Sequence, residues 1–155
     1  MKQNAHFLII GLCVFVSVTA LAQQKDVEAI KTVIAKETSS FMNVDRKNWS
    51  DTWLKAPYAY WSYSDSTGTS FVEGWEALNK TFDEYFRTQK PSKATITNEW
   101  QEIRVYGNGA YVRFVQKVKD DIDRDETSQM RVLEKTKDGQ WKVICVGAIA
   151  KYPKE

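Results

Sequence analysis

The sequence has little of the residue types on which much enzyme and metal chemistry depends: one histidine, two cysteines and three prolines in 155 residues. The histidine, His6, and one cysteine, Cys13, fall within the first 22 residues, a stretch laid out like a secretory signal peptide. Without that stretch the chain has no imidazole and a single thiol, Cys145. An internal disulfide, a histidine or cysteine metal site and a Cys–His nucleophile pair are then all excluded.

The start of the chain predicts export. Lys2 precedes an unbroken apolar run from Phe7 to Val16, and Ala20-Leu21-Ala22 follows. A charged start, an apolar segment too short for a membrane anchor and small residues at the cleavage point are typical of a signal peptide. We therefore predict cleavage after Ala22 and a bacterial protein that is exported, periplasmic or secreted, with no stable membrane anchor. Residues 23–155 suit a single domain.

Net charge is also small, because 22 lysines and arginines oppose 20 acidic residues and leave a formal charge of +2. No basic stripe of the kind that binds nucleic acid is present in the sequence. The alternating acids from Asp121 to Asp125 lack the glycine and the bidentate glutamate of a calcium loop, so we interpret them as a solvated hairpin loop. Neither a nucleic-acid partner nor a metal ion or other cofactor is predicted.

The spacing of apolar residues predicts helices at the front of the chain and strands behind them. Helical spacing covers Asp26 to Val44, Asp45 to Trp53, and a segment from about Gly74 to Pro91. Strand-like segments are Tyr58 to Ser64, Ala94 to Tyr106, Ala110 to Lys119, Ser128 to Lys135 and Trp141 to Ala150. This order predicts an α+β domain whose N-terminal helices pack in a strongly curved, mostly antiparallel sheet, a cone-shaped α+β barrel.

The order of elements and four local motifs resemble the nuclear transport factor 2-like superfamily, the cone fold that includes ketosteroid isomerase and the SnoaL-like polyketide cyclases. The motifs are the segment Asn48 to Trp53, the strand that ends at Asp65, the helix start Gly74 to Leu78, and the closing segment Lys137 to Val143. The resemblance covers nearly all of residues 23–155. It implies one domain of this fold, most similar to small exported members with no assigned reaction.

The resemblance also suggests one catalytic candidate. In the isomerase a general-base aspartate precedes the glycine of the next helix by nine residues, and that position here is Asp65. The tyrosine and the protonated acid that polarise the substrate carbonyl have no counterpart. Their positions fall on Ser40 or Phe41 and on Leu133 or Glu134. A lyase, isomerase or cyclase with Asp65 as base is thus an alternative, although aspartate is also common in turns, the interpretation we favour.

Aromatic residues are the most promising features for binding. Trp61 and Tyr63 share one strand face with Asp65, and a second predicted face ends in the polar residue Gln116. Arginine usually points outward from a half-buried strand, but an inward Arg131 would anchor a carboxylate or phosphate. Plain core packing is the competing explanation for the aromatics. The candidate pocket residues are Trp53, Trp61, Tyr63, Trp100, Phe114, Gln116 and Arg131.

These observations favour a binding protein over an enzyme. We predict an exported domain that takes a small apolar or aromatic ligand, with no assigned reaction. A second alternative is a non-catalytic interaction module. The last strand has apolar residues on both alternating faces, which predicts a homodimer through the sheet. The two sets are Trp141, Val143 and Cys145, and Ile144, Val146 and Ala148.

Overall fold

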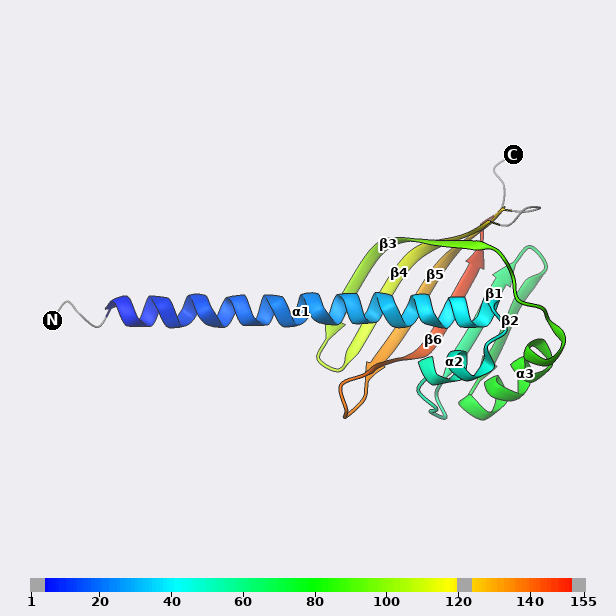
Figure 1. Ribbon diagram of the computed structural model, residues 1–155, viewed down its shortest axis with the longest axis horizontal. Helices are drawn as coiled ribbons and strands as arrows, with labels where there is room; N and C mark the ends of the chain where they lie inside the picture. Colours follow the sequence, from blue (N-terminus) through cyan, green and yellow to red (C-terminus); the bar gives the residue numbers. More distant parts are fainter. Residues whose placement is uncertain (1–4, 120–123, 152–155) are drawn as a thin grey trace.

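The structure is a computed structural model of the chain that describes residues 5–119 and 124–151, with side chains from residue 23 onward and without that of Arg124. Three helices and six strands form within these residues (Figure 1). In chain order they are α1 (Ala5–Met42), α2 (Arg46–Thr52), β1 (Tyr60–Asp65), β2 (Gly68–Glu73), α3 (Trp75–Thr88), β3 (Thr95–Tyr106), β4 (Gly109–Lys119), β5 (Arg124–Lys135) and β6 (Trp141–Ala150).

The strands form one curved sheet in the order β2-β1-β6-β5-β4-β3. All neighbouring strands are antiparallel except β1 and β6, which are parallel. Helix α1 crosses one face of this sheet, and α2 and α3 lie near its β1–β2 end (Figure 1). The predicted α+β cone with a mostly antiparallel sheet is therefore confirmed.

Helix α1 packs on the sheet through the apolar stripe that its spacing predicted. Ile30 and Ile34 are fully buried in the core, one helical turn apart. The helix ends at Met42, and Val44 beyond it has a positive φ of 58°. Toward its N-terminus α1 extends past the edge of the sheet (Figure 1). No helix among the described residues combines the length and apolar character needed to cross a membrane.

Strand β2 is the element that sequence patterning missed. Five of its six residues are exposed, so the alternation of buried and exposed positions that marks a strand is absent. It pairs with β1 across the turn between Asp65 and Gly68. Because β2 is an edge strand with little to bury, its amino-acid sequence is only weakly constrained by the core.

A bulge in β6 changes which of its residues face the core. Leu133 of β5 pairs with Val143 and Val132 pairs with Cys145, so Ile144 is an extra residue. The bulge shifts the alternation by one position, and the fully or nearly buried residues on either side of it share the inner face. The two predicted sets are therefore wrong: the inner face is formed by Trp141, Val143, Val146 and Ala148.

The inner face changes character along the central strands. Cross-strand rows begin with Ala110, Leu133 and Val143, all buried in the core. The next rows bring in Arg131, then Gln129, and then Gln116 opposite Thr127. We call the first part the apolar end of the cone and the part from Arg131 onward the polar end.

Candidate functional site

A cavity of about 170 Å³ lies at the polar end of the cone, between α1 and the inner face of the sheet. One side of it is aromatic, with rings that come from four elements: Phe41 of α1, Trp49 of α2, Trp61 of β1 and Phe82 of α3. Phe82 packs edge-on against Phe41 and Trp61, with ring centroids 5.4 and 5.1 Å apart. Such contacts fix the rings, so this wall is preformed.

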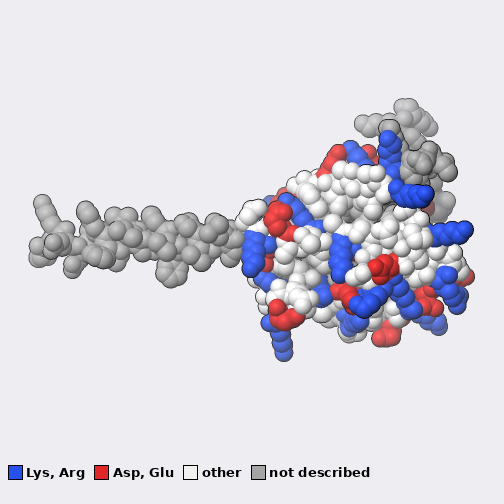
Figure 2. All heavy atoms as spheres, viewed as in Figure 1, with Lys and Arg blue, Asp and Glu red and all other residues white. Residues whose placement is uncertain are grey.

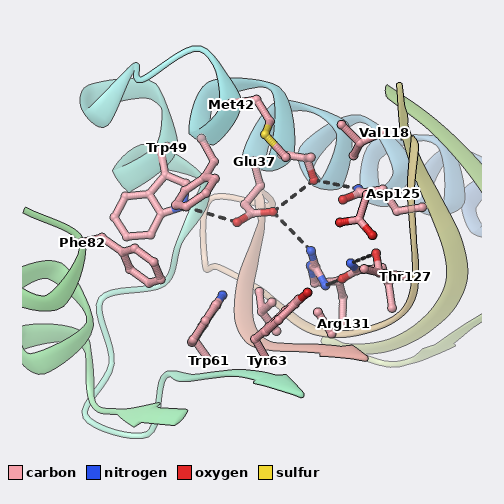
Figure 3. Close-up of a pocket in the computed structure, with 16 residues that line it drawn as sticks. Glu37, Met42, Trp49, Trp61, Tyr63, Phe82, Val118, Asp125, Thr127 and Arg131 are labelled. Carbon is pink, nitrogen blue, oxygen red and sulfur yellow. Dashed lines mark hydrogen bonds and ion pairs between the residues drawn. The ribbon is translucent and has the colours of Figure 1, made fainter. Parts of the chain in front are cut away.

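The opposite side of the cavity centres on a buried ion pair. Glu37 of α1 and Arg131 of β5 are 5 and 4% exposed, and Arg131 Nη2 lies 3.5 Å from Glu37 Oε2 (Figure 3). The guanidinium lies over the ring of Phe114, 5.4 Å from its centroid. Burial lowers the pKa of Arg131, and the neighbouring Glu37 carboxylate opposes that shift. The carboxylate and the ring face together hold a charge that burial alone would disfavour.

The five N–H groups of Arg131 are unequally used. Nη1 donates to Gln129 Oε1 at 2.6 Å and to the carbonyl oxygen of Met130 at 3.2 Å. Nη2 faces Glu37 at the longer distance given above. Nε is buried and has no hydrogen-bond partner among the described residues. A strong donor of a residue in the cavity wall thus has no acceptor within the described part of the protein.

Hydrogen bonds extend this wall on both sides of the ion pair (Figure 3). Trp49 Nε1 and Thr38 Oγ1 donate to Glu37 at 3.3 and 3.4 Å, both long for hydrogen bonds. Gln116 Nε2 donates to Thr38 Oγ1 at 3.2 Å, and Gln129 Nε2 donates to Thr127 Oγ1 at 2.6 Å. A polar network therefore runs from α2 through α1 to β4, and from Arg131 along β5.

The chemistry of these groups suits binding. Within the described part of the chain, no group of three or more histidine, cysteine, aspartate or glutamate side chains could hold a metal ion. The carboxylates that line the cavity are Glu37, which is paired with Arg131, and Asp125. The arrangement offers a flat apolar wall on one side and hydrogen-bond donors on the other.

The structure brings four of the predicted pocket residues into the cavity wall and leaves three in the core. Trp61, Tyr63, Gln116 and Arg131 line the cavity, and Figure 3 shows Tyr63 extending from β1 toward its middle. The question of whether Arg131 points outward or inward is answered by its burial beside Glu37. The other three pack in the hydrophobic core: Trp53, Trp100 and Phe114.

Asp65 does not line the cavity. It ends β1 on the face shared by Trp61 and Tyr63, but at the hairpin turn. Its Oδ1 accepts hydrogen bonds from the backbone N–H and the hydroxyl of Thr67, at 2.8 and 2.6 Å. These bonds lower the pKa of Asp65, opposite to the shift that a general base in an apolar cavity needs. Its contacts are those of a turn residue.

Several cavity residues were not predicted, and two patterns could have identified them. Glu37 and Phe41 continue the stripe of Ile30 and Ile34 at helical spacing, so a carboxylate in an apolar stripe was the available signal. Thr127 and Gln129 alternate with Arg131 on β5 and share its face. Asp125 also lines the cavity, whereas residues 121–123 of the predicted hairpin loop lie outside the described residues.

No protein-family profile matches the sequence, and no curated protein is similar to it. Solved structures do match. A nuclear transport factor 2-like protein of unknown function from Shewanella oneidensis MR-1 is 14% identical, with a TM-score of 0.63 over 80% of this chain and 98% of that one. A ketosteroid isomerase-like protein from Erwinia carotovora atroseptica SCRI1043 is 14% identical, with a TM-score of 0.60 over 81 and 96% of the two chains.

A third structure is a protein of unknown function with a cystatin-like fold from Nostoc punctiforme PCC 73102. It is 17% identical, with a TM-score of 0.59 over 81% of this chain and 91% of that one. At such identities the likeness concerns the backbone arrangement, that is, the fold alone. The chain therefore has the nuclear transport factor 2-like fold that its motifs implied.

Proposed function

We propose that this domain binds a small ligand with an aromatic or apolar ring in the cavity at the polar end of the cone. The observation that carries the proposal is the pairing, in one cavity, of a rigid aromatic wall with a buried network of hydrogen-bonding groups. Binding sites for small molecules are typically concave and mostly apolar, with a few convergent polar groups that orient the ligand. Catalysis is not part of the proposal, since Asp65 is held in a turn outside the cavity.

The size of the cavity limits the ligand. An engineered apolar cavity of roughly 150 Å³ in another protein takes up benzene. The cavity here, at about 170 Å³, has room for one ring and a small substituent. Trp61 and Phe82 present their rings to that space, and an aromatic ligand would extend their edge-to-face packing.

A thermal-shift and fluorescence screen of single-ring aromatic compounds tests this proposal. A ligand at a hundredfold excess over its dissociation constant stabilises the native state by about 2.7 kcal/mol. Trp49 and Trp61 lie in the wall, so binding should also change tryptophan fluorescence. If no compound changes the melting temperature or the fluorescence, the proposal fails.

A cavity-filling variant locates the site. Ala148 is a small lining residue, and Ala148→Phe would occupy the space of a bound ring. We expect this variant to fold and to lose the response to every ligand found in the screen. Ala77→Phe, at an exposed position of α3, is the matched control and should keep the response. Equal binding by Ala148→Phe would place the ligand elsewhere.

Export is the second part of the proposal, and the segment up to Ala22 supports it through its charged start, apolar run and small residues. Intact-mass measurement of the protein recovered from its native compartment should give a chain that starts at Gln23. A soluble cytoplasmic protein that retains residues 1–22 would contradict it.

We also propose that the outer face of the sheet forms a homodimer. Ile149, Met130 and Phe71 are 56, 37 and 63% exposed. Pairing places them on the face opposite the cavity, in adjoining rows with Gly147 between Met130 and β1. Exposed apolar groups that gather on a sheet are typical of an interface. Light scattering at micromolar concentration should give the dimer mass, and Ile149→Lys should give the monomer; a wild-type monomer would refute the proposal.

A further inference from the structure

The charges around the cavity restrict the ligand further than its shape does. Among the sixteen described residues that line it, Arg131 is the single cation, while Glu37 and Asp125 are carboxylates. Glu37 already lies beside the guanidinium, and both side chains are almost completely buried. The positive charge of Arg131 is therefore compensated before any ligand enters.

Arg131 nevertheless has a donor to offer. Its Nη1 is occupied by Gln129 and the Met130 carbonyl, whereas Nε has no partner among the described residues. Nε and Nη2 lie on the same edge of the guanidinium group, and Glu37 Oε2 lies 3.5 Å from Nη2. A buried N–H without an acceptor is costly, so an acceptor brought by a ligand gains a hydrogen bond that the free protein lacks.

We propose that the ligand of this cavity carries a neutral hydrogen-bond acceptor, such as a carbonyl or carboxamide oxygen, that receives the Nε–H of Arg131. The ring of the ligand then packs on the aromatic wall of Trp61 and Phe82. This inference rests on the proposed binding function and names the chemical class of the ligand. It differs from the carboxylate or phosphate that an inward arginine suggests from the sequence alone.

Charge disfavours an anionic head group, and hydrogen-bond chemistry disfavours a cationic one. A ligand carboxylate would place a second buried negative charge beside Glu37 with one cation to serve both, and Asp125 adds a further carboxylate at the wall. An uncompensated charge in a low-dielectric site is strongly disfavoured. An ammonium head group carries only donors, so it would leave the Arg131 Nε–H without an acceptor. A neutral acceptor satisfies the donor and leaves the charge balance unchanged.

A matched pair of probes tests the inference on the wild-type protein. Benzamide and benzoate have the same ring and nearly the same shape, and at neutral pH only benzoate is charged. We expect benzamide to bind at least about tenfold more tightly, measured by tryptophan fluorescence or by NMR titration. Its binding should also shift the ¹⁵Nε–¹H resonance of Arg131, assigned as the signal that disappears in Arg131→Lys.

Removing the competing charge should change the preference. In Glu37→Gln the guanidinium is uncompensated, so benzoate should gain at least about tenfold relative to benzamide. Glu84→Gln removes the same charge from an exposed position on α3 and should leave the ratio of the two affinities unchanged.

The outcomes separate this inference from the proposed function. Equal affinities, or tighter binding of benzoate by the wild-type protein, overturn the neutral head group while binding in the cavity stands. Benzamide binding without a shift of the Arg131 Nε resonance overturns the proposed donor. Should Glu37→Gln fail to fold, the wild-type affinities and that resonance still decide. If no ring compound binds at all, the proposed function itself fails.

Discussion

The apolar and polar ends of the cone are built from the same strands, and they differ in a few residues on one face. At the apolar end Ala110, Leu133 and Val143 form a row that is completely or almost completely buried. On β5 the next inward-facing residue after Leu133 is Arg131, and the one after that is Gln129. At the same strand parity, β5 thus changes from an aliphatic side chain in the filled core to polar side chains that line the cavity.

Helix α1 also changes from buried aliphatic residues to polar residues along its length, at the same level as the sheet. Ile30 and Ile34 are fully buried in the core, and one turn later the helix presents Glu37 and Thr38 to the cavity. The transition on α1 meets the transition on β5 at the Glu37–Arg131 pair. A buried charged residue on either element is costly unless it meets its partner, so the ion pair favours the placement of α1 that brings Glu37 beside Arg131.

Breaking the Glu37–Arg131 pair is expected to lower the stability of the protein more than any other change considered below. Arg131→Met removes the cation and leaves the Glu37 carboxylate buried, which should lower the free energy of unfolding by about 3–5 kcal/mol. Urea unfolding monitored by tryptophan fluorescence measures the change. The double variant Arg131→Met with Glu37→Leu removes both charges and should recover most of the loss. If Arg131→Met were as stable as the wild type, the Glu37–Arg131 pair would not contribute to the stability of the fold.

Truncation of a buried side chain at the apolar end should lower the free energy of unfolding by nearly as much but leave ligand affinity unchanged. Leu133 is fully buried one inward position from Arg131. Leu133→Ala should lower the free energy of unfolding by about 2–5 kcal/mol through lost burial and a new cavity. Affinity for a ring compound, measured below the unfolding temperature, should stay within about threefold of the wild type. A large loss of affinity would mean that the two ends are not separate in function.

At the polar end, Gln116 links two elements through its side-chain amide. Its Nε2 lies 3.2 Å from Thr38 Oγ1 and 3.1 Å from Asn98 Oδ1. Gln116→Leu keeps the volume and removes the donor, so we expect a loss of about 1–3 kcal/mol from the acceptors left unpaired. Gln89→Leu, at an exposed position after α3, is the control for the change in residue type. If Gln116→Leu were as stable as the wild type, solvent would already reach these acceptors.

The apolar end was largely predictable from the sequence, because periodicity reports burial directly. The stripe of Ile30 and Ile34 predicted the inner face of α1, and the glycine-containing turns at Gly107 and Gly139 predicted two hairpins. Both glycines have positive φ, the conformation that glycine adopts at least cost. Local patterns sufficed where local geometry and burial agreed.

The polar end was less predictable, since its meaning depends on contacts between distant segments. Arg131 has an inward and an outward interpretation, and Glu37, which decides between them, comes from α1. The bulge at Ile144 left no signal, because apolar residues occur at every neighbouring position of β6. The aromatic candidates Trp53, Trp100 and Phe114 have the same composition signal as Trp61, and only packing distinguishes core from cavity wall.

The smallest effect is expected at Asp65, which shares a strand face with Trp61 and Tyr63 but lies beyond the polar end. The hydrogen bonds from Thr67 lower the pKa of Asp65 in the folded state. A carboxylate with a lowered folded pKa stabilises the protein above its unfolded pKa, and that contribution is lost as the pH falls through the folded value. Asp65→Asn should therefore be slightly less stable than the wild type at neutral pH, and the difference should disappear in acid. Urea unfolding across this pH range measures it. Ligand affinity should not change, because the Asp65 side chain does not line the cavity. If Asp65→Asn kept the stability of the wild type but no longer bound the ligand, Asp65 would belong to the binding site.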